Sequence, residues 1–119
     1  MSRILVVDDE PDLRYLLRRI FENAGHEVRD AGHGADALES VRAFPPDLVV
    51  TDIMMPVMDG VELMRRLRSD PATAKIPILV ASANSDLAGA ADVAVAKPYN
   101  SAQLMAAAND LLAQTEGRR

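Results

Sequence analysis

The sequence predicts an α/β fold, a doubly wound sheet of five parallel strands with helices on both faces. Short strand-like runs alternate along the chain with segments whose apolar residues recur every three or four positions, as in amphipathic helices. Most of the runs are apolar at successive positions, which is typical of parallel strands buried on both faces. The 119 residues, 49% of them hydrophobic, suffice for one domain with one core. We therefore expect a single domain over residues 1–119, with a polar tail at 115–119.

The first half of the chain carries three of the strands. We expect strands at residues 3–8, 26–31 and 47–51, and helices at 11–24 and 34–44. Pro11 suits the first turn of its helix, where a missing N–H costs nothing, and Gly25 suits the position after the helix end. The second strand is more polar than the others, so we place it at an edge of the sheet. The residues expected to face the core are Leu13, Leu16, Leu17, Ile20, Phe21 and Ala24 in the first helix, and Ala37, Leu38 and Val41 in the second.

The second half supplies the remaining strands, at 76–81 and 92–96, and helices at 59–69 and 101–114. Asp59 is a suitable N-terminal cap, and Asp70-Pro71 breaks the helix that follows it. Residues 83–91 contain one large apolar residue, Leu87, so we expect a short turn or a mobile loop there instead of a packed helix. The core-facing residues predicted for the two helices are Val61, Met64 and Leu67, and Leu104, Ala107, Ala108, Leu111 and Leu112.

Polar side chains gather where the strands end. The predicted strand order is 2-1-3-4-5, and its switch point lies between the first and third strands, at their carboxyl ends. Asp8 and Asp9 follow the first of these strands, and Asp52 follows the third. Ser82 and Lys97 end the fourth and fifth strands. Because the carboxyl ends of parallel strands share one edge, we expect these five residues to line one site.

Composition excludes several classes of function. The formal net charge of −5 argues against a nucleic-acid-binding surface, which needs a basic face. The chain has no cysteine, so disulfides and thiolate metal sites are impossible. No apolar run is long enough to span a membrane, and the N-terminus carries no secretory signal pattern. We expect a cytoplasmic protein that binds neither nucleic acid nor membrane.

The three carboxylates point to a metal-assisted reaction. Carboxylates a few ångströms apart repel one another, and a divalent cation offsets that repulsion. Hard oxygen ligands favour Mg²⁺ or a similar ion such as Mn²⁺. A carboxylate beside such an ion can attack a phosphoryl group, and Lys97 and the Ser82 hydroxyl would stabilise the charge on its oxygens. Each residue alone has an ordinary explanation, as a helix-terminus charge, a turn residue or a surface lysine; the hypothesis depends on their convergence at one edge.

The chain also resembles a known family, the receiver domain of response regulators in two-component signalling, which has a flavodoxin-like fold. Three stretches carry the resemblance: Ile4-Leu5-Val6-Val7-Asp8-Asp9-Glu10, the run from Asp52 through Met55-Pro56-Val57-Met58-Asp59-Gly60, and Lys97-Pro98-Tyr99. The resemblance implies a stand-alone receiver. Its phosphoryl donor would be a histidine kinase or a histidine phosphotransfer protein, and its downstream partner is unknown. It would not be an enzyme beyond catalysing its own phosphorylation and dephosphorylation.

The resemblance also implies a role for each candidate residue. Asp52 would be the phosphoacceptor. Asp9, Asp52 and the backbone carbonyl of Met54 would bind Mg²⁺ directly, and Asp8 would hold it through water. Lys97 would contact the phosphoryl group, and Ser82 would be the hydroxyl that turns toward it.

Two departures from the family pattern concern the output. Receivers typically carry Tyr or Phe three residues before the lysine, where this chain has Ala94. Ser82 and Lys97 are also closer in the sequence than is typical, by about two helical turns, so the fourth helix of the family is expected to be shortened or absent. We therefore expect signalling to differ from the usual switch, or to use other surfaces.

Two alternatives remain open. The chain could be a degenerate receiver that binds a protein partner regardless of phosphorylation, which Ala94 and the short 83–91 segment favour. A pull-down of partners with wild type and Asp52→Asn separates the two readings. A phosphatase with an aspartyl nucleophile ranks last, because such enzymes generally place a second acid two residues after the nucleophile, where this chain has Met54.

The phosphorylated form is predicted to be long-lived. Met54 and Asn84 lie two residues after Asp52 and Ser82, at positions that in the family flank the path of the attacking water. Because Met54 offers no hydrogen bond to that water, we expect slow self-dephosphorylation. The check is the decay of the acyl phosphate in purified protein, and decay within seconds would contradict the prediction.

Overall fold

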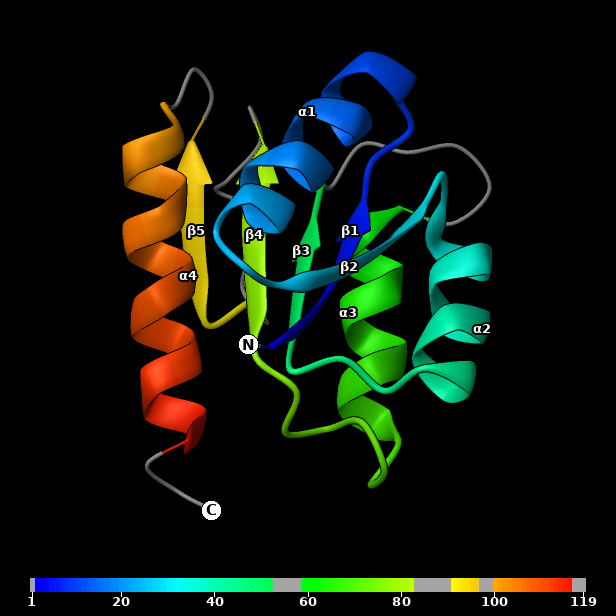
Figure 1. The fold of residues 1–119 in the computed structure, drawn as a ribbon. Coiled ribbons are helices and arrows are strands. Elements are labelled where there is room, and N and C mark those ends of the chain that lie inside the picture. Colours follow the sequence, from blue (N-terminus) through cyan, green and yellow to red (C-terminus); the bar gives the residue numbers. More distant parts are fainter. Residues whose placement is uncertain (1, 53–58, 83–90, 97–99, 117–119) are drawn as a thin grey trace.

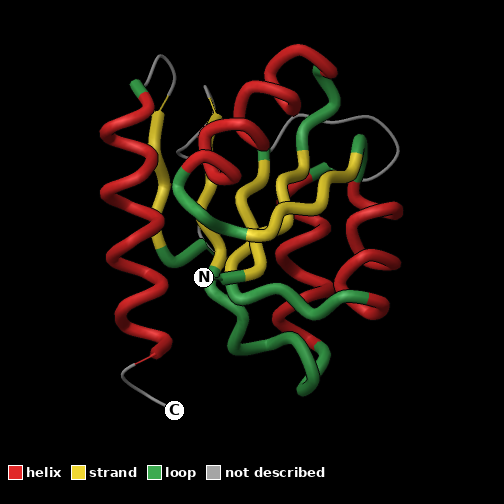
Figure 2. Tube along the Cα trace, viewed as in Figure 1, coloured by secondary structure: helices red, strands yellow, loops and turns green. Residues whose placement is uncertain are grey.

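The computed structural model describes residues 2–52, 59–82, 91–96 and 100–116, and these form a three-layer α/β/α domain (Figures 1 and 2). The strands are β1 (Arg3–Val7), β2 (Glu27–Ala31), β3 (Leu48–Thr51), β4 (Ile78–Ser82) and β5 (Val93–Ala96). The described helices are α1 (Pro11–Asn23), α2 (Gly34–Ala43), α3 (Gly60–Ser69) and α4 (Ser101–Glu116). All strand pairs are parallel, in the order β2-β1-β3-β4-β5. The predicted fold class, strand order and edge position of β2 are confirmed.

Each face of the sheet has its own core. Successive side chains of a strand point to opposite faces, so Ile4 and Val6 pack with α1 and α4, whereas Leu5 and Val7 pack with α2 and α3. All four of these side chains are buried. Figure 1 shows α1 and α4 on one side of the sheet and α2 and α3 on the other. Burial on both faces explains why β1 and β3 read as continuous apolar runs.

The predicted apolar stripe of α1 is only partly correct. Leu17 and Phe21 are buried, and Leu13 and Ile20 pack against the same core. Leu16 is 54% exposed, and Ala24 is also exposed. At about 100° per residue, Leu16 lies roughly 100° around the helix from Leu17 and roughly 140° from Phe21. Periodicity alone therefore gave the right stripe but placed its centre too far toward Leu16.

The same correction applies to α3. Met64 and Leu67 are buried as predicted, but Val61 is 42% exposed, and Leu63 is fully buried in its place. Gly60, the first residue of α3, is also buried. Val61 directly follows the buried Gly60, so its side chain is turned by about 100° around the helix from Gly60, toward solvent.

The helix ends follow the local signals in the sequence. Gly25 has φ of 93°, in the left-handed region that glycine tolerates best, and it lies just past the end of α1. The Asp59 carboxylate accepts a hydrogen bond of 2.9 Å from the Glu62 N–H and caps α3, as predicted. The His33 ring accepts one from the Asp36 N–H and caps α2.

A polar clamp fixes where β4 and β5 begin. The Asp92 carboxylate accepts a hydrogen bond of 2.8 Å from the Ile78 N–H, and the Asp92 N–H donates one of 2.9 Å to the Ile78 carbonyl. Arg68, near the end of α3, donates to the Asp92 carboxylate and to the carbonyls of Ala74 and Ile76. Residues 83–90 lie outside the described residues, so the expected turn in place of a fourth helix stays a prediction.

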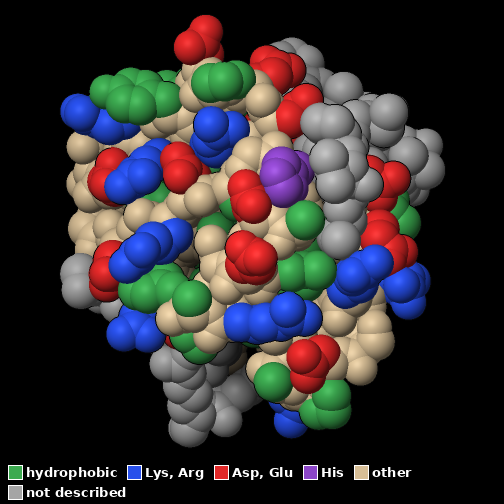
Figure 3. Space-filling view, turned by 90° about the vertical axis from the view of Figure 1, so that its right-hand side faces the viewer, with side chains coloured by type: hydrophobic (Ala, Val, Ile, Leu, Met, Phe, Trp, Pro, Cys, Tyr) green, Lys and Arg blue, Asp and Glu red, His purple; other side chains and the backbone are tan. Residues whose placement is uncertain are grey.

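The described surface carries charges of both signs. Lys and Arg side chains are interspersed with Asp and Glu on the face shown in Figure 3, the one that carries α2 in Figure 1. Among the described helices, none has the length and apolar character needed to cross a membrane.

The free energy of unfolding should depend strongly on the buried apolar residues of α4 and only weakly on the exposed Leu16 of α1. Leu104 is fully buried, so Leu104→Ala is expected to lower the free energy of unfolding by about 2–5 kcal/mol. Leu16→Ala removes the same atoms from a largely exposed side chain and is expected to change it by about 0.5 kcal/mol or less. Urea unfolding followed by circular dichroism measures both. Equal losses would show that α1 and α4 bury different faces from those described.

Candidate functional site

The sheet register places two aspartates side by side. In the β1–β3 pairing Val7 lies opposite Thr51, so Asp8 and Asp52 occupy the next position on neighbouring strands. Their backbones continue the hydrogen bonding of the sheet. The Asp52 N–H donates to the Val7 carbonyl at 3.0 Å, and the Asp8 N–H donates to the Ala31 carbonyl of β2 at 3.2 Å. Neighbouring strands lie about 4.8 Å apart, so the two carboxylates cannot be far from one another.

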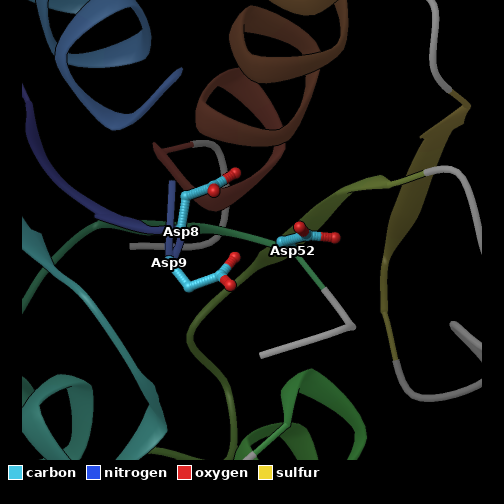
Figure 4. A group of neighbouring side chains, drawn as sticks. All are labelled: Asp8, Asp9 and Asp52. Atoms are coloured by element: carbon cyan, nitrogen blue, oxygen red, sulfur yellow. The ribbon is translucent and has the colours of Figure 1, made fainter. Parts of the chain in front are cut away.

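Asp9 completes a group of three carboxylates with Asp8 and Asp52. One carboxylate oxygen from each residue lies within 4.8 Å of the others. Figure 4 shows Asp8 and Asp9 at the end of β1, with their carboxylates directed toward the side where Asp52 lies. Asp8 is 1% exposed and Asp52 is 7% exposed, whereas Asp9 is open to solvent. Three hard oxygen donors gathered in one place, one of them accessible from solvent, suit Mg²⁺ or a chemically similar cation.

Hydrogen bonds hold the two buried aspartates in place. The Asp8 carboxylate accepts from the Glu10 N–H at 2.9 Å, which stabilises the turn between β1 and α1. The Thr51 hydroxyl donates to the Asp52 carbonyl at 2.8 Å. The Arg14 guanidinium donates to the Asp8 carbonyl, also at 2.8 Å. The acidic group is therefore supported from the sheet on one side and from the first turns of α1 on the other.

Of the other predicted site residues, the structure describes Ser82 but not Met54 or Lys97. Ser82 is the last residue of β4, and its backbone pairs with Ala96 of β5. Met54 and Lys97 lie outside the described residues, so their predicted roles stay predictions. Ala94 lies within β5, opposite Val80, and its side chain is exposed.

Sequence reasoning missed Arg14. Arg14 lies outside the core-facing stripe predicted for α1, and nothing in that pattern indicates a contact with Asp8. Gly32 was the available signal, because a Cβ atom there would lie 3.3 Å from Arg14 Nη1. A glycine just after a strand indicates a place where another group approaches closely.

Comparisons with known proteins agree with this geometry. Residues 4–109 match the response regulator receiver domain family. The chain is 36% identical to the DNA-binding response regulator MtrA of Mycolicibacterium smegmatis, over 97% of this chain but 52% of that protein. The chain thus spans about half the length of that curated relative.

Solved structures give the same result. The response regulator TrrA of Thermotoga maritima, crystallised in complex with Mg²⁺ and BeF, superposes with a TM-score of 0.85 at 34% identity, covering 93% of this chain and 99% of that one. The signal receiver domain of a histidine kinase from Syntrophus aciditrophicus gives a TM-score of 0.88 at 27% identity, covering 96% and 92%. With its five-stranded sheet, its carboxyl-edge acids and this match over residues 4–109, the chain belongs to the response regulator receiver domain family.

Proposed function

We propose that Asp52 accepts a phosphoryl group from a histidine kinase or a histidine phosphotransfer protein in a Mg²⁺-dependent reaction, and that a protein partner recognises the phosphorylated form. The observation that carries the proposal is the gathering of the Asp8, Asp9 and Asp52 oxygens within 4.8 Å at the carboxyl edge of a receiver domain. The chain would then be a signalling module that catalyses only its own phosphorylation and dephosphorylation.

Asp52 is the best placed of the three carboxylates to be the nucleophile. Asp8 already uses one carboxylate oxygen to accept from the Glu10 N–H, so it supports its own turn. Asp9 is exposed and lies on a turn, where a nucleophile would be poorly shielded from water. Asp52 is 7% exposed at the end of β3, between β1 and β4. The family pattern noted in the sequence favours the same assignment.

The acidic group suits a divalent cation. We propose that Asp9, Asp52 and the Met54 carbonyl would bind it directly and Asp8 through water. Bound there, the cation would offset the repulsion between attacking carboxylate and phosphoryl oxygens. TrrA, crystallised with Mg²⁺ and BeF, supports Mg²⁺ as the ion. Oxygen ligands also accept Mn²⁺.

The transfer requires little of the protein beyond positioning and charge. An Asp52 carboxylate oxygen forms the new bond to phosphorus while the bond from phosphorus to the donor imidazole nitrogen breaks. That nitrogen keeps the bonding electron pair and is free to take a proton. We propose that Lys97 and the Ser82 hydroxyl contact the phosphoryl oxygens, which carry the charge that develops in the transition state. Water later attacks phosphorus, the bond from phosphorus to the Asp52 oxygen breaks, and inorganic phosphate and the free Asp52 carboxylate result.

Recognition of the phosphorylated form would not use a switching aromatic ring at position 94. Ala94 is an exposed alanine of β5, so no ring is present there to swing inward. The same observation favours the degenerate receiver as the second candidate function. For either reading we propose a cytoplasmic location, because a chain without cysteine, and hence without disulfides, fits a reducing compartment.

Loss of the Asp52 carboxylate is expected to abolish phosphorylation. Incubation of wild type with acetyl phosphate and Mg²⁺ should add the mass of one phosphoryl group, detected by intact-protein mass spectrometry. Asp52→Asn should add none, because the amide is not a nucleophile at phosphorus. Asp110→Asn is the matched control, since Asp110 is an exposed residue of α4, outside the group of three carboxylates, and this variant should be labelled like wild type.

Removal of Mg²⁺ with EDTA is expected to prevent labelling of wild type and of Asp110→Asn alike. A wild type that stays unlabelled with Mg²⁺ present, and gives the same amide NMR spectrum with and without beryllofluoride, would refute the phosphoacceptor function. If partner binding in a pull-down were then equal for wild type and Asp52→Asn, the degenerate receiver would be the better reading.

A further inference from the structure

Arg14 links two places in the fold: the turn after β1, which carries Asp8 and Asp9, and the end of β2. Its guanidinium Nη1 donates to the Asp8 carbonyl at 2.8 Å, and its Nε lies 3.7 Å from the Asp30 carboxylate. Both partners lie outside α1: Asp8 follows β1, and Asp30 is the fourth residue of β2. The Arg14 side chain is mostly shielded from solvent, with 24% of it exposed. One side chain of α1 therefore ties two strands of the sheet together beside the site.

Gly32 makes room for this guanidinium. A Cβ atom at position 32 would lie 3.3 Å from Arg14 Nη1, closer than ordinary contact allows. The glycine thus lets Arg14 lie against the backbone that follows β2, with its fork directed at Asp8 and Asp30. Lysine places its three N–H donors on one nitrogen and lacks this planar fork, so it is expected to hold the two separate acceptors less well.

A hydrogen bond to the Asp8 carbonyl influences the orientation of Asp9. It belongs to the peptide bond between Asp8 and Asp9, which is planar, so fixing its oxygen fixes the plane from which Asp9 projects. The Asp8 N–H is already held by the Ala31 carbonyl, and the Asp8 carboxylate by the Glu10 N–H. Asp9 is exposed, and within the described part of the chain no buried core encloses its side chain. The Arg14 contact is a hydrogen bond that acts on the peptide plane directly before Asp9.

We propose that Arg14 is a positioning residue for the metal centre: it orients the Asp8–Asp9 peptide so that the Asp9 carboxylate is held ready for Mg²⁺. This inference rests on the proposed function. It assigns to Arg14 a role that its place on the polar side of a helix does not suggest. Removal of a group that orients a metal ligand through a hydrogen bond typically lowers metal affinity or activity by roughly 10–100-fold.

Arg18 provides the matched control. It lies one turn further along α1 and also pairs with Asp30, at 3.6 Å, and with Glu22, at 3.4 Å. Among the described residues, its ion-pair partners are Asp30 and Glu22 and do not include Asp8. Replacing Arg18 by Met therefore removes the same charge from the same helix and disturbs the same Asp30, but leaves the Asp8 carbonyl contact intact.

The test is Mg²⁺ affinity, measured by isothermal titration calorimetry and by amide NMR shifts, because the chain has no tryptophan to report binding by fluorescence. We expect Arg14→Met to bind Mg²⁺ roughly tenfold more weakly than wild type. Arg14→Lys keeps the charge without the fork and is expected to lose several-fold. Arg18→Met is expected to bind like wild type. Thermal unfolding of each variant shows whether it is folded.

The outcomes separate the inference from the proposed function. If wild type does not bind Mg²⁺, the proposed function fails. If wild type binds, equal affinities of Arg14→Met and wild type, or equal losses in Arg14→Met and Arg18→Met, overturn the positioning role. Wild-type affinity in Arg14→Lys overturns it as well, because charge alone would then suffice, and this variant decides the question if Arg14→Met does not fold.

Discussion

The parallel pairing of β1 with β3 is the constraint on which the rest of this molecule depends. With Val7 opposite Thr51, the next residue on each strand is an aspartate, and the two aspartates share one edge of the sheet. A shift of the pairing by one residue would separate them and turn the apolar side chains of a strand to the wrong faces. Because both strands are buried on both faces, the cores above and below the sheet set this register. Hydrophobic packing thus determines where the charged residues meet.

Much of the fold follows from local patterns in the sequence. Continuous apolar runs identified the buried strands, and Gly25, Asp59 and Asp70-Pro71 marked helix ends that the structure confirms. Leu16 and Val61 were placed wrongly for one reason. A helical repeat shows that a stripe exists, but only the neighbouring elements decide which part of it is covered.

The acidic site was predictable for the same topological reason, since three carboxylates follow two strands that flank the switch point. The Arg14 contact was not predictable, because it depends on how α1 lies over the end of β2 and on the space left by Gly32. Such a contact joins residues of three separate segments, and no short-range repeat in a sequence encodes it. The roles of Met54, Lys97 and the Ser82 hydroxyl stay predictions from the family pattern.

The clamp between Ile78 and Asp92 has a consequence for how this chain can vary. Two hydrogen bonds and the Arg68 contacts fix the start of β5 against the start of β4. Variation at Asp92 or Arg68 would therefore loosen the register of β5 against β4 at the amino ends of these strands, at the far end of the sheet from the aspartates.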